Sequence, residues 1–175
     1  MAETTEQLAV RFAECAPELR DWAEKAAYEN LKTRLQVGDL AAAQAGNTLT
    51  LLLAGVGGAL AYALPLFDGR MKPVTVAAAV VCLYLAVLAG LVLVKCLMLT
   101  GVPTVYNEPA NLLQPGYSHA DVQAGELANL QERIGEVKAR NRARAWWLNR
   151  LRAAAVATPF VFAAAAAALA TVLTP

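Results

Sequence analysis

Histidine and cysteine are scarce in this chain, which limits the chemistry it can support. Of its 175 residues, one is a histidine, His119, and three are cysteines, at positions 15, 82 and 96. A single histidine excludes a histidine-based metal cluster, and the cysteines have the spacing of neither a metal site nor a disulfide framework. No glycine-rich segment is followed by the Lys-Ser/Thr pair of a phosphate-binding loop. We therefore expect no metal, no cofactor and no enzymatic activity.

Charge is also missing from three long apolar stretches. They are residues 45–67, 74–99 and 153–173; the second contains a single charge, Lys95, and the third contains none. Each reaches the ~20 residues that a helix needs to cross the ~30 Å hydrocarbon core of a bilayer. Hydrophobic residues make up 58% of the chain, more than in a soluble domain. The sequence predicts an all-α integral membrane protein with three transmembrane helices.

Lys and Arg are distributed unevenly around these stretches, which predicts the orientation of the chain. Five precede the first stretch, two lie in the link 68–73, seven lie in 101–152 and none follows the third stretch. By the positive-inside rule, the N-terminus and residues 101–152 are cytoplasmic and the C-terminus is outside. The polar first forty residues are unlike a cleavable signal peptide, so we expect the first span to direct insertion. The predicted segments are a cytoplasmic N-terminal helical segment (1–38), a two-span hairpin (39–100), a cytoplasmic loop and long helix (101–152) and a third transmembrane helix (153–175).

Turn and cap signals divide the polar parts of the chain into helices and one loop. Apolar residues at three-to-four spacing over 5–35 predict one or two helices, with a break near Pro17. No strong breaker precedes the first span, so a helix is expected to continue into the bilayer. Residues 101–117, with three prolines and two glycines, predict a loop. Ser118 and Asp121 have capping-box spacing and predict the start of a long helix that runs into the third span.

That long helix carries a heptad seam. Its positions alternate between spacings of three and four: Leu127, Leu130, Ile134, Val137, Asn141, Arg144, Leu148 and Leu151. A buried Asn at such a position can fix the register of a coiled coil, which makes Asn141 a candidate helix-packing residue. Two interpretations remain open: the seam meets another copy of the chain, or it packs against residues 5–35 of its own chain.

Small residues recur at every fourth position in the first two spans. The positions are Gly46, Thr50, Ala54 and Gly58 in the first span and Ala78, Cys82, Ala86 and Gly90 in the second. Lipid supplies no hydrophobic force for joining helices, so close approach over small residues contributes much of the contact energy. We expect these stripes to join the two spans in a hairpin within one chain, in preference to joining subunits. Gly46, Ala54 and Gly58 are the helix-packing candidates.

Polar residues within or beside the spans are the candidates for pore lining and membrane contact. Lys95, Asn47 and Thr50 are candidate pore or gating residues, although Lys95 near a span end can also extend its amine to the headgroups. A basic and aromatic cluster stands directly before the third span: Trp146, Trp147, Arg150 and Arg152. This position suits an aromatic belt and an anionic inner leaflet better than a nucleic acid, so we predict a lipid partner and no nucleic-acid partner.

The layout resembles the small transmembrane effectors of bacterial anti-phage defence, namely the Pycsar membrane effectors and the SLATT proteins. The resemblance covers the entry from Asn30-Leu31-Lys32 through Asp39-Leu40-Ala41, the glycine-containing first span, the Val102-Pro103 turn and the helix of residues 126–152. It implies a homo-oligomer in the inner (cell) membrane that permeabilises the membrane in response to a nucleotide signal or a soluble protein partner. The chain departs from the pattern because it has no visible nucleotide-binding segment.

A second class of function fits the same sequence. A non-conducting membrane subunit, either an immunity protein against a toxin or an anchor for a soluble partner that binds residues 101–152, needs the same spans but no pore. A phage holin is disfavoured, because a hole-forming protein needs little chain outside its spans and this one has a large cytoplasmic portion.

Overall fold

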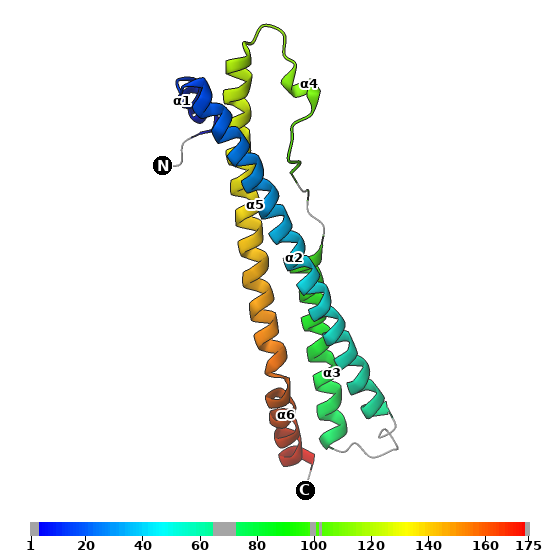
Figure 1. Ribbon diagram of the computed structural model, residues 1–175. Coiled ribbons are helices and arrows are strands. Elements are labelled where there is room, and N and C mark those ends of the chain that lie inside the picture. The colour runs from blue at the N-terminus through cyan, green and yellow to red at the C-terminus, as the bar shows by residue number, and fades with distance from the viewer. Residues whose placement is uncertain (1–3, 65–72, 99–100, 102, 174–175) are drawn as a thin grey trace. The chain divides into compact units, whose positions relative to one another are not determined.

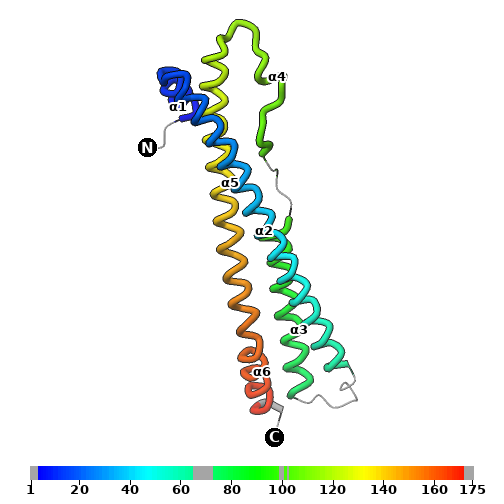
Figure 2. Tube along the Cα trace, viewed as in Figure 1, coloured from blue at the N-terminus to red at the C-terminus, as the bar shows by residue number. Residues whose placement is uncertain are grey.

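A computed structural model describes residues 4–64, 73–98, 101 and 103–173, and every regular element in these ranges is a helix (Figures 1 and 2). The prediction of an all-α protein is confirmed for this part of the chain. The elements are α1 (Thr5–Ala13), α2 (Pro17–Ala63), α3 (Pro73–Val92), the π-helix η2 (Leu93–Leu97), α4 (Pro109–Leu112), α5 (His119–Val156) and α6 (Thr158–Leu173).

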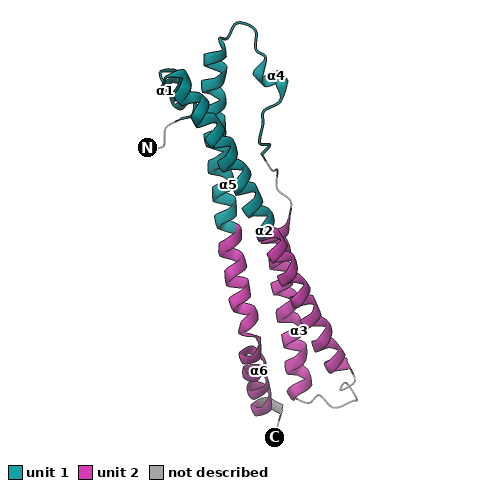
Figure 3. Cartoon of the chain, in the orientation of Figure 1, with its two compact units in different colours: residues 1–40, 100–143 teal, residues 41–99, 144–175 magenta. Residues whose placement is uncertain are grey.

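The chain forms two compact units, coloured separately in Figure 3. Unit 1 comprises residues 1–40 and 100–143, and unit 2 comprises residues 41–99 and 144–175. The boundary falls inside α2 and inside α5, and both helices are continuous across it. The expectation that one helix extends from the polar N-terminal region into the first apolar stretch is therefore confirmed.

The helix starts of unit 1 follow the signals in the sequence. Pro17 occupies the first position of α2, where its missing N–H costs nothing because that group has no partner within a helix. Ser118 Oγ accepts from the N–H of Asp121 (3.2 Å), and Asp121 Oδ2 accepts from the N–H of Ser118 (3.2 Å). This reciprocal pair is the predicted capping box, and it begins α5.

Within unit 1, α2 and α5 lie side by side and run in the same direction (Figure 1). Leu31, Leu130 and Val137 are fully buried between them, with Tyr28 and Ile134 packed around this core. Arg20 donates to the carbonyl oxygen of Ala120, and Asn141 donates to that of Arg34, in the same order along both helices. The first part of the heptad seam is therefore buried within its own chain, as the second of the two interpretations expects.

Unit 2 has one apolar core, to which α2, α3 and α5 contribute. The buried residues are Ala45, Leu52, Val81, Leu85, Leu88, Ala89, Val92, Cys96, Leu148 and Leu151. The α3 helix packs against α6 and runs antiparallel to α5: Cys96 Sγ lies 3.9 Å from the oxygen of Arg144, and Tyr84 lies beside Ala154. Within unit 2, α3 therefore runs in the direction opposite to α5, as expected for successive spans of a membrane.

Two helical segments, Pro17–Ala63 and Pro73–Leu97, are long and apolar enough to cross a membrane. A third candidate exists if α5 and α6 are taken as one bent span, since the two helices meet at an angle of 46°. The third predicted stretch thus differs from the single uninterrupted helix that the sequence suggested. Phe67, Leu99 and most of the link 68–73 lie outside the described residues.

Pro159 explains the break in the third stretch. Because proline has no N–H and its ring clashes with the preceding turn, the carbonyls before it lose their helical partners. The carbonyl that would have accepted from position 159 is that of Ala155, and Thr158 Oγ1 donates to it instead (2.6 Å). The oxygen of Ala154 accepts from the N–H of Ala157 (3.0 Å) and also from the Tyr84 hydroxyl of α3 (2.7 Å). Such substitutes are required where no water is present, since a free carbonyl in hydrocarbon costs several kcal/mol.

Candidate functional site

The small-residue stripe of the first span points away from the rest of unit 2. Ala54 and Gly58 are exposed, and a Cβ atom added at Gly46 or Gly58 would meet no atom within 4 Å. Within unit 2, the buried residues of α2 lie on the opposite face: Ala45, Thr48, Leu52 and Ala63. The expectation that this stripe packs in the hairpin is wrong, because a second face of the same helix, also with three-to-four spacing, is the one that packs.

The stripe of the second span is divided between packed and exposed positions. Ala78 is buried, and Cys82 Sγ lies 4.0 Å from the carbonyl oxygen of Val56 on α2. Ala86 and Gly90 are exposed. The closest approach of α3 to α2 uses a different glycine, Gly55, where an added Cβ would come within 2.9 Å of Leu85.

Two of the three candidate pore residues, Asn47 and Thr50, lie on the exposed face of α2 beside the stripe. Thr50 satisfies its hydroxyl within its own helix, by donating to the carbonyl oxygen of Gly46 (3.1 Å). The Asn47 amide makes no hydrogen bond to any described residue. An amide that faces hydrocarbon without a partner is costly, so this face is incomplete as a lipid-facing surface.

Lys95 lies in η2, the π-helical segment that ends the second span, and is exposed. Its amine stands 5.5 Å from the centroid of the Trp147 ring on α5, a cation–π distance. Short π-helical turns inside α-helices occur frequently at functional sites. The candidate gating residue is thus placed against one of the predicted interface residues.

The residues of the basic and aromatic cluster of α5 make two kinds of contact, some with one another and some with α2. Trp146 and Trp147 meet edge to face at 4.8 Å, and the Arg150 guanidinium stacks on Trp146 at 3.7 Å. Arg152 instead reaches α2, where Nε donates to Thr48 Oγ1 at 3.0 Å and the terminal nitrogens donate to Gln44. Sequence reasoning did not identify Gln44 and Thr48 as its partners, because nothing local links positions so distant in the chain.

The charge of unit 2 has one sign. Residues 41–99 and 144–175 hold six Lys and Arg and a single acid, Asp68, which lies outside the described residues. Lys95 and Arg150 contact tryptophan rings, and Arg152 donates to a hydroxyl and to the amide and carbonyl oxygens of Gln44. An anion that approached this surface would meet no described carboxylate within the unit.

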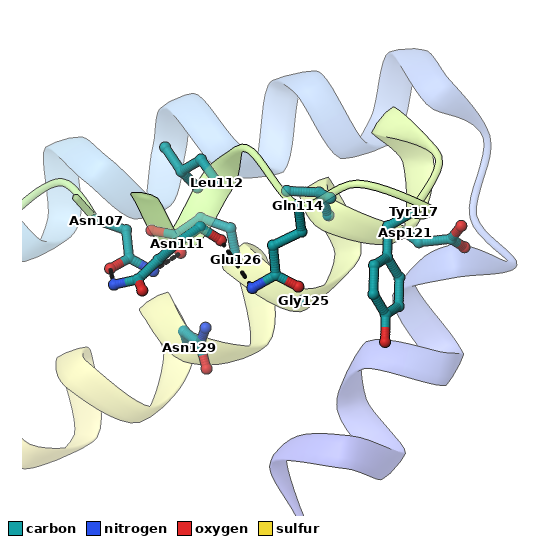
Figure 4. Close-up of a pocket in the computed structure, with 10 residues that line it drawn as sticks. Asn107, Asn111, Leu112, Gln114, Tyr117, Asp121, Gly125, Glu126 and Asn129 are labelled. Atoms are coloured by element: carbon teal, nitrogen blue, oxygen red, sulfur yellow. Dashed lines mark hydrogen bonds between the residues drawn. The ribbon is translucent and has the colours of Figure 1, made fainter. Parts of the chain in front are cut away.

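Unit 1 contains a cavity of about 240 Å³ between the 107–117 segment and α5 (Figure 4). Asn107 ties this segment to α5 by donating to Glu126 (3.1 Å), whose carboxylate also pairs with Arg133 (3.4 Å). The cavity is lined by Asn107, Asn111, Leu112, Gln114, Tyr117, Asp121, Val122, Gly125, Glu126 and Asn129. The sequence marked this segment as a loop; the density of amides in it, and a glycine inside the facing helix, are the signals that could have indicated a site.

Hydrogen bonding fixes the charge of one lining residue. Ser118 donates to the Asp121 carboxylate from both its hydroxyl and its N–H, and these bonds lower the pKa of Asp121 below its usual value. Asp121 is therefore ionised at neutral pH. Among the described residues, no group of three or more His, Cys, Asp and Glu side chains is arranged to hold a metal ion.

Comparison with known proteins found no match to any family, to any curated protein or to any solved structure.

Proposed function

We propose that this chain is the membrane-permeabilising effector of a bacterial anti-phage system and acts as a homo-oligomer in the inner membrane. The observation that carries the proposal is the uncovered face of α2, defined by Gly46, Asn47, Thr50, Ala54 and Gly58. The layout that resembles known effectors of this kind supplies the biological setting.

Physical reasons favour association of this face with a second copy. Lipid tails cannot satisfy the Asn47 amide, whereas a partner helix can. The absence of side chains at Gly46 and Gly58 lets the backbone of that helix approach closely, which strengthens the dispersion contacts and the hydrogen bonds. Assembly through α2 would thus convert a costly lipid-facing surface into an interface, and would line its centre with polar groups.

In the proposed arrangement unit 1 lies in the cytoplasm and unit 2 lies in the bilayer, with the C-terminus outside. The Lys and Arg distribution supports this orientation. Lys95 lies in η2, and Trp146, Trp147 and Arg150 lie near the start of the unit 2 part of α5; in this arrangement all four would face the cytoplasmic headgroups. The positive charge of unit 2 would make the conducting state favour anions over cations, because fixed charges of one sign select the opposite ion.

The proposal is tested by expressing the chain in bacteria and following the membrane potential with a fluorescent dye. We expect depolarisation by the wild type and its loss in Gly58→Leu, where a bulky side chain would keep a second helix away. Val87→Leu, an exposed position on α3 outside this face, is the matched control and should still depolarise. The mass of the detergent-solubilised particle should fall in Gly58→Leu and not in the control.

The outcome that contradicts the proposal is a wild-type monomer that causes no leak. A non-conducting anchor would then be favoured by a different observation, the exposure of apolar side chains on the 101–117 segment. Leu113 is 79% exposed and Tyr106 is 66% exposed. An anchor should retain a soluble protein in pull-downs, and Leu113→Asp should release it.

A further inference from the structure

The cavity of unit 1 offers a ligand several free hydrogen-bond acceptors. The amide oxygens of Asn111 and Gln114, and Oδ1 of Asp121, accept from no described residue. Asn129, on α5 beneath the segment in Figure 4, has both its oxygen and its nitrogen without a described partner. Each of these amides also keeps at least one free N–H, so hydrogen bonding alone does not select the charge of a ligand.

The charge of the side chains that line the cavity favours a cationic ligand. Two carboxylates, those of Asp121 and Glu126, lie at the cavity, and no Lys or Arg lines it. Glu126 is only 5% exposed and is balanced by Arg133. The exposed Asp121 carboxylate accepts hydrogen bonds from Ser118 alone, and the nearby charge of Arg20, which does not line the cavity, stabilises it further. A phosphate would therefore meet repulsion here, and a cation with several N–H groups would find both charge and acceptors.

Size and shape restrict the ligand further. A volume of about 240 Å³ lies just below the ~300–1,000 Å³ of typical sites for drug-sized molecules. Gly125 lies within α5 on the floor of the cavity, and a Cβ atom added there would meet nothing within 4 Å. Glycine inside a helix costs about 1 kcal/mol relative to alanine. Gly125 therefore does not stabilise α5, and its effect is to leave the floor of the cavity open.

We infer that this cavity is a binding site for a small organic cation that carries ammonium or guanidinium groups. Such a molecule would donate to the oxygens of Asn111, Gln114 and Asn129 and would neutralise the carboxylate of Asp121. Binding joins the 107–117 segment to α5, both in unit 1. This ligand would be the signal that activates the effector. That role rests on the proposed function, whereas binding of the ligand does not.

The test uses the full-length chain in detergent and agmatine, which carries both cationic groups, as the probe in isothermal titration calorimetry. Gly125→Leu should abolish binding, because the leucine fills the cavity while it favours the helix. Gly135→Leu is the matched control: it lies in the same helix in unit 1, it is exposed, its added Cβ also meets nothing within 4 Å, and it is not a lining residue. This control should bind agmatine as the wild type does.

Charge and hydrogen bonding are tested separately. Asp121→Asn keeps an oxygen that can accept from Ser118 and removes the charge, and we expect agmatine to bind about tenfold more weakly, since a bond to a charged group is worth more than a neutral one. Asn129→Leu should weaken binding to a similar degree. The neutral analogue 1,4-butanediol should not bind.

Three results would each overturn the inference. They are no heat of binding with agmatine, equal binding in Gly125→Leu, and binding of ATP or 1,4-butanediol at the same site with comparable affinity. The dye assay separates this inference from the proposed function. Agmatine binding without any leak at any agmatine concentration would leave the site in place and would remove the effector role.

Discussion

In unit 1, carboxylates take part in the polar contacts between α2 and α5, whereas in unit 2 the cations Lys95, Arg150 and Arg152 contact rings and neutral polar groups. Gln123, which is 9% exposed, donates to the carboxylates of Asp21 (2.7 Å) and Glu24 (2.9 Å). In unit 2, Lys95 rests on a tryptophan ring and Arg152 donates to a hydroxyl and an amide. The same two helices thus use different chemistry on the two sides of the unit boundary.

The proposed surroundings of the two units account for this difference. Residues 1–40 and 100–143 hold thirteen acids and nine Lys and Arg, so carboxylates are available as partners in unit 1. If unit 2 lies in hydrocarbon, as proposed, an additional carboxylate there would be expensive to insert, and Lys95, Arg150 and Arg152 use neutral partners instead. Four substitutions test this comparison.

The largest effect is expected from truncation of the unit 1 core. Leu130→Ala should lower the free energy of unfolding by about 2–5 kcal/mol, because Leu130 is fully buried and a cavity would remain. Leu88→Ala, its counterpart in the unit 2 core, should cost less, since lipid tails are as apolar as leucine and only packing is lost. Thermal unfolding in micelles, followed by circular dichroism, measures both. Equal losses would indicate that water, not lipid, surrounds unit 2.

The second effect concerns Asn141, whose amide donates to Arg34 (2.7 Å) and lies 3.0 Å from the position of a Cβ at Gly38. Asn141→Leu should destabilise the chain by about 1–3 kcal/mol, because the bond is lost and the added bulk meets the other helix. Asn149→Leu, exposed on the same helix, should change stability little. Since these contacts lie within one chain, the particle mass should stay the same; a smaller particle from a folded variant would place Asn141 between subunits.

The third effect concerns the bend between α5 and α6. Tyr84→Phe removes the hydroxyl that donates to Ala154, and we expect a loss of about 0.6 kcal/mol, as is typical for hydrogen bonds between helices in a membrane. Tyr62→Phe is the control, because Tyr62 is 53% exposed and donates to no described residue. Unfolding in micelles gives the comparison. A loss above about 2 kcal/mol would contradict this expectation, because the Ala154 carbonyl still accepts from the N–H of Ala157.

The smallest effect on stability is expected at Lys95. Lys95→Gln should cost at most about 1 kcal/mol, since a cation–π contact at an exposed site contributes ~0.5–1 kcal/mol, and Lys95→Arg should restore it. The same variants sharpen the functional question, because reversal potentials across a planar bilayer measure ion preference. If Lys95 faces the conducting path, Lys95→Gln should reduce anion preference although stability barely changes. An unchanged reversal potential would mean that Lys95 does not influence ion preference and only makes the cation–π contact with Trp147.

Part of this architecture was readable from the residues because it depends on near neighbours. The break at Pro17, the cap formed by Ser118 and Asp121, and the continuity of α2 all follow from interactions within a few positions. The bend in the third stretch was less accessible. Pro159 is visible in the sequence, but the helix ends before it, and the Tyr84 hydroxyl that also binds the Ala154 carbonyl comes from α3.

Candidate site residues were harder to interpret, as the two faces of the first span illustrate. Ala45, Thr48 and Leu52 are three and four residues apart, and the small-residue stripe recurs at every fourth position, so each set lies on one helix face and periodicity alone cannot tell which face packs. The seam gave the same ambiguity, because a heptad pattern fits a partner helix from either chain. The cavity was invisible, since it exists only where the 107–117 segment lies over Gly125.

By itself, the sequence determined the continuity of α2, the starts of α2 and α5 and the sign of the charge around the apolar stretches, because caps and breakers act locally. The tertiary structure decided which face of α2 is covered, where Arg152 and Asn141 find their partners, and that a cavity lies on α5. Asn141 and Arg34 stand 107 positions apart. Such pairs are selected by the fit of whole helix surfaces, and no local pattern contains that fit.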